Sequence, residues 1–245
     1  FLQKKIMKLN PHVSVDCVIF GFDGQSLKVL LLDRNMGLPE GKMNAPTSLK
    51  LPGSMVYDDE DVDSAAIRVL KELTGLENIY LQQFHVFGSP ERLKKNDDLN
   101  WLQSITHMKI NRVVTVAYYS LIKLNKSLTC EGKVIWLDVM KLPELAFDHN
   151  EIIQKGLQIL RRDFHYRPLA FELLPKKFTI RQLQTLYELI LGKKLDSRNF
   201  RKTINKWEYI VPINEKEKNV AHKPAQYYRF SKNIYNKKQK EYLGN

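Results

Sequence analysis

The chain has 245 residues, 43% of them hydrophobic, and a net charge of +12. This length is enough for two domains with separate cores, and no apolar run approaches the roughly 20 residues that cross a bilayer. We therefore expect a soluble protein without membrane partners. With only Cys17 and Cys130 there is no disulfide framework, and the segment FLQKKIMKLN lacks the apolar centre of a secretory signal, so we predict a cytoplasmic protein with reduced thiols.

The charge is distributed unevenly along the chain. Residues 1–160 contain 19 Lys and Arg and 19 Asp and Glu, whereas residues 161–245 contain 20 basic and 8 acidic residues. A strongly basic domain after a neutral one indicates a polyanionic partner, most often nucleic acid. The alternative, a solvated basic tail, fits residues 232–240 but not the well-patterned stretch before them.

Apolar segments bounded by turn residues predict a β-sheet in the first part of the chain. Strands are expected at 12–22, 27–34, 79–89, 111–124 and 134–143. A polar loop at 35–48 precedes a short strand and a helix, and a charged loop is expected at 91–110. A helix at 150–163, with Ile and Leu at helical spacing, ends this part.

Residues 53–76, GSMVYDDEDVDSAAIRVLKELTGL, resemble the Nudix box, a helix whose clustered glutamates hold magnesium for pyrophosphate cleavage. The residues that match the box pattern are Glu60, Arg68, Leu70, Glu72, Gly75 and Leu76. Two of its carboxylate positions are instead Val69 and Leu73, which share one helix face, and its glycine is Ser54. We therefore predict no catalytic residues, no bound metal and no cofactor, and a protein that is not an enzyme.

Two alternatives remain for the acidic residues of this segment. Glu72 is either an i, i+4 partner of Arg68 or a hydrogen-bond acceptor for a bound effector. The run Asp58, Asp59, Glu60, Asp61 and Asp63 offers substitute metal ligands, but carboxylates at a helix N-terminus are favourable for the helix dipole alone. An active Nudix hydrolase of a sugar nucleotide would need cations held by Glu60, Glu72 and residues outside the box.

The C-terminal part has the pattern of a helix-turn-helix. Thr179 and Gln182 form a capping box before an amphipathic helix that ends at Gly192. A short turn leads to a second helix, SRNFRKTINKW at 197–207, capped by Asp196 or Ser197. Its apolar residues, Phe200, Ile204 and Trp207, are expected to face inward. The short strands YIVPI and QYYRFS around a charged hairpin complete a winged helix.

We expect the second helix and the hairpin to carry side chains that bind DNA, the alternative for this basic helix being a solvated face. Arg and Asn read guanine and adenine edges, and Lys binds phosphates. The candidate DNA-binding residues are Ser197, Arg198, Asn199, Arg201, Lys202, Asn205, Lys206, Lys216, Lys218, His222 and Lys223.

The segment FELLPKKFTIRQLQTLYELILGKKLDSRNFRKTINK, followed by HKPAQYYRF, resembles the C-terminal domain of the Nudix-related transcriptional regulators, the NrtR family. FGSPER at 87–92 and RVVTVAY at 112–118 are also similar to family segments, although the insertion at 93–111 is longer than expected. The resemblance implies an α+β protein. We expect an N-terminal Nudix-type α/β/α sandwich with a mixed sheet at 1–160, a winged helix-turn-helix at 161–231, and a basic tail at 232–245.

The resemblance also implies a homodimeric repressor or activator that binds a palindromic operator in double-stranded DNA and senses a small-molecule effector. Members of the family that control NAD synthesis respond to ADP-ribose, and others control pentose catabolism, including the arabinose regulators (AraR) of Bacteroidetes. The degenerate box retains few groups that would hold a diphosphate, and a neutral sugar needs a small cavity with convergent hydrogen-bond partners. We therefore favour a pentose, arabinose first, over ADP-ribose.

Polar residues that interrupt apolar strands indicate where an effector would bind. Asp16 lies inside VSVDCVIF and Lys50 inside LKLPG, and each costs desolvation energy unless it is paired. The candidate effector-binding residues are Asp16, Arg34, Lys50 and Glu72. A structural bridge from Asp16 to Arg34 or Lys50 is the alternative.

Overall fold

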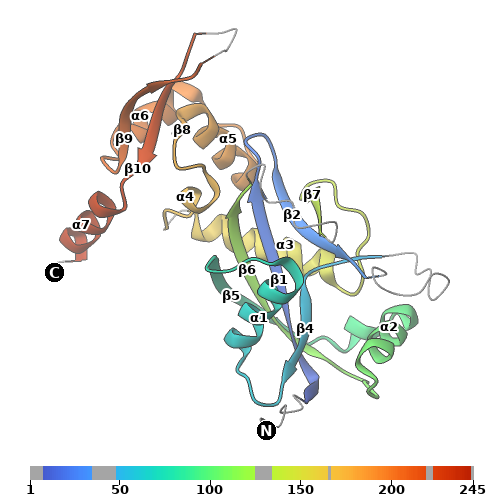
Figure 1. The fold of residues 1–245 in the computed structure, drawn as a ribbon. Helices are drawn as coiled ribbons and strands as arrows, with labels where there is room; N and C mark the ends of the chain where they lie inside the picture. Colours follow the sequence, from blue (N-terminus) through green and yellow to red (C-terminus); the bar gives the residue numbers. More distant parts are fainter. Residues whose placement is uncertain (1–7, 35–47, 125–133, 165–166, 219–222, 244–245) are drawn as a thin grey trace. The chain divides into compact units, whose positions relative to one another are not determined.

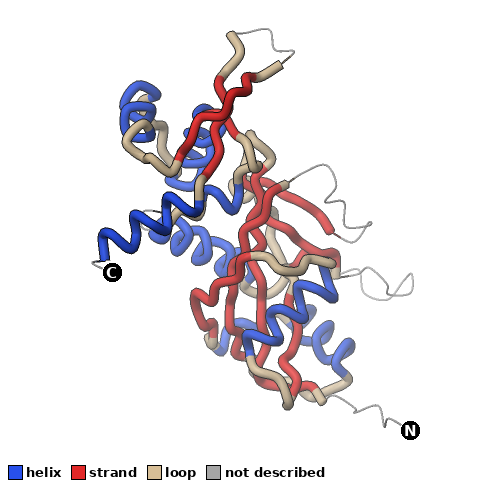
Figure 2. The backbone as a smooth tube through the Cα atoms, turned by 60° about the vertical axis from the view of Figure 1, so that its left-hand side comes forward, coloured by secondary structure: helices blue, strands red, loops and turns tan. Residues whose placement is uncertain are grey.

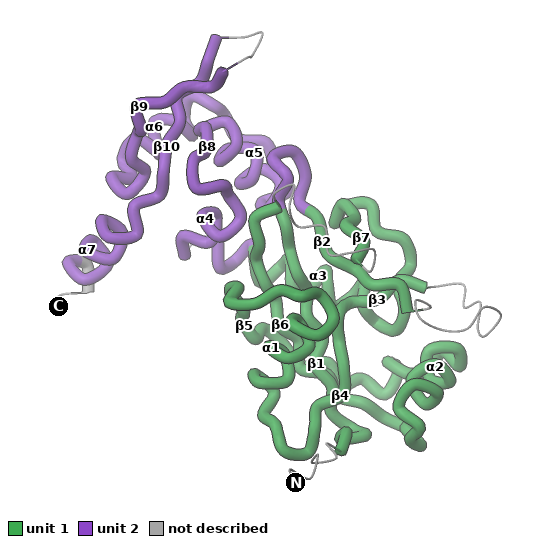
Figure 3. The backbone as a smooth tube through the Cα atoms, viewed as in Figure 1, with its two compact units in different colours: residues 1–21, 28–160 green, residues 22–27, 161–245 purple. Residues whose placement is uncertain are grey.

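The computed structural model describes residues 8–34, 48–124, 134–164, 167–218 and 223–243. The chain divides into two compact units, residues 1–21 with 28–160 and residues 22–27 with 161–245 (Figure 3). The predicted loop at 35–48 lies almost entirely outside the described residues, as does Cys130. None of the described helices has both the length and the apolar character needed to cross a bilayer.

The first unit is built on a seven-stranded sheet (Figure 1). Its strands are β1 (Leu9–Phe22), β2 (Leu27–Asp33), β3 (Leu49–Lys50), β4 (Gly53–Tyr57), β5 (Tyr80–Phe87), β6 (Val114–Lys123) and β7 (Val134–Asp138). The order is β3-β2-β1-β6-β5, with β4 paired to β1 and β7 paired to β2. The central strands β1 and β6 are largely buried, as expected when both faces of a sheet are covered. All five strands predicted from the sequence are present.

Helices α1 (Val62–Thr74) and α3 (His149–Asp163) cover opposite faces of this sheet (Figure 2). Successive side chains of a strand point to opposite faces. Cys17 of β1 belongs to the core cluster that contains the apolar residues of α1, whereas a Cβ placed on Gly156 of α3 would lie 3.7 Å from Val18. The two neighbours on β1 therefore face different helices, which is the three-layer arrangement predicted for this part.

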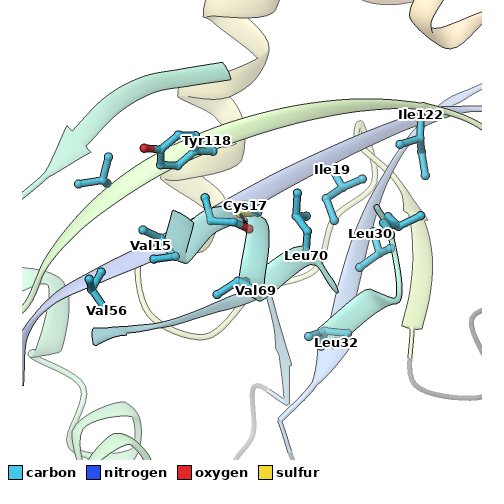
Figure 4. Close-up of a cluster of buried hydrophobic side chains, with 14 residues drawn as sticks. Val15, Cys17, Ile19, Leu30, Leu32, Val56, Val69, Leu70, Tyr118 and Ile122 are labelled. Atoms are coloured by element: carbon cyan, nitrogen blue, oxygen red, sulfur yellow. Dashed lines mark hydrogen bonds between the residues drawn. The ribbon is translucent and has the colours of Figure 1, made fainter. Parts of the chain in front are cut away.

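Local signals fix both ends of α1. The Asp61 carboxylate accepts a hydrogen bond from the Ser64 amide at 2.7 Å, and Gly75 ends the helix with a left-handed φ of 70°. The buried residues Ala65, Ala66, Val69 and Leu70 face the sheet (Figure 4).

The prediction of a loop at 91–110 was wrong. This segment contains a short 3-10 helix, η1 (Pro90–Leu93), and the helix α2 (Asn96–Thr106). The inward residues Asp98, Trp101 and Leu102 follow helical spacing, but the first of them is charged and obscures the apolar pattern.

The second unit is a winged helix, as predicted. Its elements are α4 (Ala170–Leu173), β8 (Phe178–Thr179), α5 (Ile180–Leu191), α6 (Ser197–Ile204), β9 (Ile210–Lys216), β10 (Gln226–Phe230) and α7 (Lys232–Leu243), and the sheet order is β8-β10-β9. Both halves of the capping box between Thr179 and Gln182 are formed, and Gly192 ends α5 with a φ of 68°. Asp196, rather than Ser197, caps α6.

Two boundaries in this unit differ from the prediction. Helix α6 ends at Ile204 rather than at residue 207. The segment predicted as a basic tail forms α7, because Tyr235 packs its ring 5.3 Å from that of Tyr209 and Lys238 pairs with Glu208 at 2.5 Å. An aromatic anchor therefore orders a stretch whose composition is otherwise that of a solvated tail.

Candidate functional site

A cavity of about 200 Å³ opens in the first unit beside the paired strands β1 and β4. Its walls come from these strands, from η1 and α2, and from the start of α3. Its polar lining residues are Ser14, Asp16, Lys50, Ser54, Arg92, Thr106 and His149. Its apolar lining includes Met55, Trp101, Leu102, Ile105 and Phe147.

Asp16 is the central acidic group of the cavity. Its Oδ2 lies 3.4 Å from Arg92 Nη2, and its Oδ1 lies 3.6 Å from His149 Nε2. Arg92 Nε also donates to Asp148 Oδ2 at 2.8 Å. Burial acts to raise the pKa of Asp16, but the electrostatic effects of His149, Arg92 and Lys50 outweigh it and hold this pKa below its ordinary value. Asp16 is therefore a carboxylate at neutral pH.

His149 is a neutral imidazole in this arrangement. Its Nδ1 accepts a hydrogen bond from the Leu51 amide at 2.9 Å, so the proton resides on Nε2, which faces Asp16. Burial lowers the pKa of His149 to about 4, in agreement with this geometry. The imidazole is thus a fixed hydrogen-bond donor rather than a charge.

Lys50 is a buried cation in the wall of the cavity. Its Nζ donates to the carbonyl oxygens of Leu51 at 3.1 Å and Gly53 at 3.4 Å and lies 5.7 Å from the centre of the Trp101 ring. No carboxylate of the described residues is within ion-pair distance of this nitrogen. Burial lowers the pKa of Lys50 to about 8. An ammonium group in such a position is suited to bind an anionic group of a ligand.

Gly53 is required by the close approach of β4 to Asp16. A Cβ at this position would lie 2.0 Å from Asp16 Oδ1 and 2.8 Å from the Val15 carbonyl oxygen. We expect Gly53→Ala to displace the Asp16 carboxylate from Arg92 and to lower the free energy of unfolding by about 1–3 kcal/mol. Urea denaturation measures this change. The control is Gly88→Ala, where the nearest atom would be 3.5 Å away; equal stability of the two variants would contradict the steric argument.

Arg34 is held beneath α2 and does not form part of the cavity surface. Its guanidinium pairs with Asp98 at 2.5 Å, and both side chains are 0% exposed. Asp98 also accepts from the Phe147 amide at 2.8 Å, and the Arg34 carbonyl accepts from Trp101 Nε1 at 3.3 Å. This buried pair therefore fixes the helix that forms one wall of the cavity.

The residues of the segment that resembles the Nudix box make structural contacts. Arg68 binds Glu60 at 2.5 Å, Glu72 at 3.2 Å and the Met55 carbonyl oxygen at 3.1 Å. Val69 is completely buried among sheet residues such as Val15 and Cys17 (Figure 4). The hydrogen bonds from Arg68 lower the pKa of Glu60. Within the described residues, no group of three His, Cys, Asp or Glu is arranged to hold a metal ion.

The acidic run before the helix has similar roles. Asp61 caps α1, Asp63 accepts a hydrogen bond from the Tyr118 hydroxyl, and Asp58 lies 3.8 Å from Lys8. Each of these three carboxylates therefore has a protein partner.

Two of the four predicted effector residues, Asp16 and Lys50, line the cavity together. Arg34 lies under α2, and Glu72 lies on α1 with Arg68, where its side chain is 54% exposed. The suggested bridge from Asp16 to Arg34 was wrong, because Arg34 pairs with Asp98. Lys50 interacts with Asp16 electrostatically, but Asp16 forms its ion pair with Arg92. The effector-binding role of all four residues stays a prediction.

Sequence reasoning missed Arg92, His149 and Trp101 as cavity residues. Arg92 belongs to the FGSPER segment and was available as a signal, whereas His149 begins α3 without a distinctive sequence pattern. Trp101 was assigned to a loop.

The second unit presents a basic face on α6 and the hairpin. Phe200 and Ile204 are buried, and Trp207 is half-buried, as predicted. The remaining candidate residues of this helix and turn are all exposed: Ser197, Arg198, Asn199, Arg201, Lys202, Asn205 and Lys206. Lys216, Lys218 and Lys223 of the hairpin are exposed too, and His222 lies outside the described residues. The Gln184 amide of α5 donates to the Leu195 carbonyl and Ser197 Oγ at 2.9 and 3.0 Å, which fixes the turn before α6.

These features define a protein class in which a Nudix domain is followed by a winged-helix domain. Residues 10–155 match the model of the NUDIX domain, and residues 170–230 match that of the NrtR DNA-binding winged helix domain. The chain belongs to the NrtR family of Nudix-related proteins.

Individual relatives agree with this assignment. The chain is 30% identical over 234 residues to the ADPR responsive transcriptional repressor NtrR of Acinetobacter baylyi, covering 92% of this chain and 84% of the relative. It is also 30% identical over 153 residues to an ADP-ribose pyrophosphatase of Methanocaldococcus jannaschii, covering 62% and 77% of the two chains. The crystal structure of Shewanella oneidensis NrtR with a 27mer DNA has the same fold, with a TM-score of 0.65 and 24% identity over 89% of this chain and 93% of that one.

Proposed function

We propose that this protein is a DNA-binding transcriptional regulator that responds to ADP-ribose. In this proposal α6 and the hairpin bind a palindromic operator as part of a homodimer, and the Nudix domain binds the effector without cleaving it. The observation that carries the proposal is that Lys50, a buried cation, lines the Nudix cavity with no carboxylate of the described residues within ion-pair distance.

The choice of ADP-ribose reverses the preference for a pentose. That preference rested on the lack of cations in the box, but Lys50 and Arg92 supply cations from outside it. A neutral sugar offers Lys50 no opposite charge, whereas a phosphate would form an ion pair with it. Both the Acinetobacter repressor and the Methanocaldococcus hydrolase are described by their relation to ADP-ribose, which supports the same ligand class and gives no support to arabinose.

Thermal unfolding with a panel of ligands tests the proposal. A ligand at 100 times its Kd adds about 2.7 kcal/mol to stability, so ADP-ribose is expected to raise the melting temperature and to change the affinity for operator DNA. Arabinose, ribose and xylose serve as controls. A rise in the melting temperature with arabinose and none with ADP-ribose would instead support a pentose effector.

Hydrolysis of ADP-ribose is the competing function, and the Methanocaldococcus relative gives a reason to test it. Glu60 and Glu72 both bind Arg68 here, and Val69 and Leu73 pack with the core. We therefore expect no magnesium-dependent release of AMP. Turnover that disappears in the Glu72→Gln variant would show that the protein is an enzyme.

The pKa of Lys50 predicts how effector binding depends on pH. Burial lowers this pKa to about 8, and the ammonium form is the one that attracts a phosphate. Affinity for ADP-ribose should therefore be highest below pH 8 and should fall as the pH rises from 8 to 9.5. Calorimetric titration over this range measures the effect. Lys50→Met is the control, because it should bind weakly and lose the pH dependence; a flat profile for the unaltered protein would contradict the role of Lys50.

A further inference from the structure

We infer that Glu188 is a positioning residue for DNA binding, which orients α6 through the connection that joins it to α5. This inference rests on the proposed function and adds a residue that lies outside the set of candidate DNA contacts. The connection spans residues 192–196, between the end of α5 and Ser197, the first residue of α6. Because it is the covalent link between the two helices, its conformation sets the angle at which α6 meets DNA.

The Glu188 carboxylate contacts three groups on α5 and in the connection. Its Oε1 accepts hydrogen bonds from the Leu195 amide and from Gln184 Nε2, both at 3.0 Å. Its Oε2 accepts from Lys194 Nζ at 3.0 Å, and the Glu188 side chain is only 13% exposed, whereas that of Lys194 is 93% exposed. Both carboxylate oxygens are therefore bound inside the protein and are turned toward the connection.

Gln184 extends the same network to the start of α6. Its amide nitrogen donates to the Leu195 carbonyl oxygen at 2.9 Å and to Ser197 Oγ at 3.0 Å. The amide and the carbonyl of Leu195 are thus both bound by side chains of α5. The next residue, Asp196, caps α6 with its carboxylate. Glu188 therefore fixes the backbone immediately before the cap of the helix that carries the arginines.

The charge of Glu188 opposes DNA binding, which distinguishes a positioning role from an electrostatic one. The residue lines the same groove between α5 and α6 as the cations Arg181, Lys194 and Arg201. The hydrogen bond from the Leu195 amide is the largest of the effects that hold the pKa of Glu188 below its ordinary value, so the side chain is a carboxylate at neutral pH. A negative charge beside a DNA-binding helix weakens the attraction for phosphates. Loss of the charge alone should therefore strengthen binding, whereas loss of the hydrogen bonds should weaken it.

Fluorescence anisotropy on the whole chain separates these two effects, with a duplex that the unaltered protein selects from a random library. Glu188→Ala is expected to weaken binding about tenfold or more, because it removes the acceptor of the Leu195 amide. Glu188→Gln keeps an oxygen at this position and should bind within about threefold of the unaltered protein, or more tightly. The matched control is Glu208→Ala, which removes the same charge and an ion pair with Lys238 from the same unit and should also stay within about threefold. Equal affinities for Glu188→Ala and Glu208→Ala, or equal losses in the two Glu188 variants, would overturn the inference.

A second comparison tests whether Glu188 acts through α6. In Glu188→Ala the displaced helix no longer presents Arg201 correctly, so adding Arg201→Ala should cost much less affinity than it does in the unaltered protein. Adding Lys216→Ala, on the hairpin, should cost the same in both backgrounds. An unchanged cost of Arg201→Ala would contradict the positioning role.

Amide hydrogen exchange measures the hold on the connection without DNA. Glu188→Ala should accelerate exchange across residues 193–200 by about tenfold or more, and Glu208→Ala should leave it unchanged. If Glu188→Ala loses its native circular dichroism, Gln184→Ala takes its place in both measurements, because it removes the bonds to the connection and to α6. Unchanged exchange would overturn the inference, whereas a protein that selects no duplex would refute the proposed function instead.

Discussion

Replacing Arg198, Arg201 and Lys202 together by alanine is expected to weaken operator binding by at least about 100-fold. All three side chains are exposed on α6, whose buried residues Phe200 and Ile204 face the other way. One bidentate contact to a base contributes about 1–3 kcal/mol to discrimination. Each lost phosphate contact also reduces, by about 0.9, the steepness with which the logarithm of the association constant falls with the logarithm of the salt concentration.

The measurement is fluorescence anisotropy at several salt concentrations, with a duplex that the unaltered protein selects from a random library. A control variant with Lys71, Lys94 and Lys95 changed to alanine loses the same charge from the first unit and should keep its affinity within a few-fold. If the two triple variants lose affinity equally, net charge rather than α6 determines binding. If the α6 variant binds normally, this helix is not the recognition element.

The Asp98→Ala variant is expected to lose about 3–5 kcal/mol of the free energy of unfolding. The change leaves the completely buried guanidinium of Arg34 without its carboxylate partner, and removal of one member of a buried pair carries a cost of this size. It also removes the acceptor of the Phe147 amide. Total stabilities of domains are about 5–15 kcal/mol, so a large part of the stability depends on this one residue.

Urea denaturation of three variants checks the interpretation. Glu72→Ala breaks the pair with Arg68, where Glu72 is 54% exposed, and should cost no more than about 1 kcal/mol. The double variant Arg34→Met with Asp98→Leu replaces both charges by apolar groups and should recover most of the lost stability. Equal costs for Asp98→Ala and Glu72→Ala would show that the buried pair is not a major contributor.

The elements that were predicted correctly are specified by residues that lie close together in the sequence. The strands of the sheet, the capping box at Thr179 and the glycine end of α5 each depend on residues within a few positions of one another. The inward residues of α6 follow from its own periodicity. Such patterns are visible in the sequence because the interactions that they report are close along the chain.

The parts that were missed depend on distant partners. Asp16 pairs with Arg92, 76 residues away, and Arg34 pairs with Asp98, 64 residues away. Asp98 hides the amphipathic pattern of α2 because it is a charged residue that faces inward. A single sequence does not show which buried charges meet, so it indicated that Asp16 and Lys50 are unusual but not which groups surround them.

The packing of Val69 has an evolutionary consequence. Val69 is completely buried in the core beside Cys17 and Val15, so a glutamate restored at this position would introduce an unpaired charge into an apolar cluster. Regaining the box carboxylate would therefore destabilise the fold before any metal could be held. Release of Glu60 and Glu72 from Arg68 would be needed as well. A carboxylate at position 69 thus requires compensating substitutions in the sheet, so the packing of this helix resists a single change toward the box pattern.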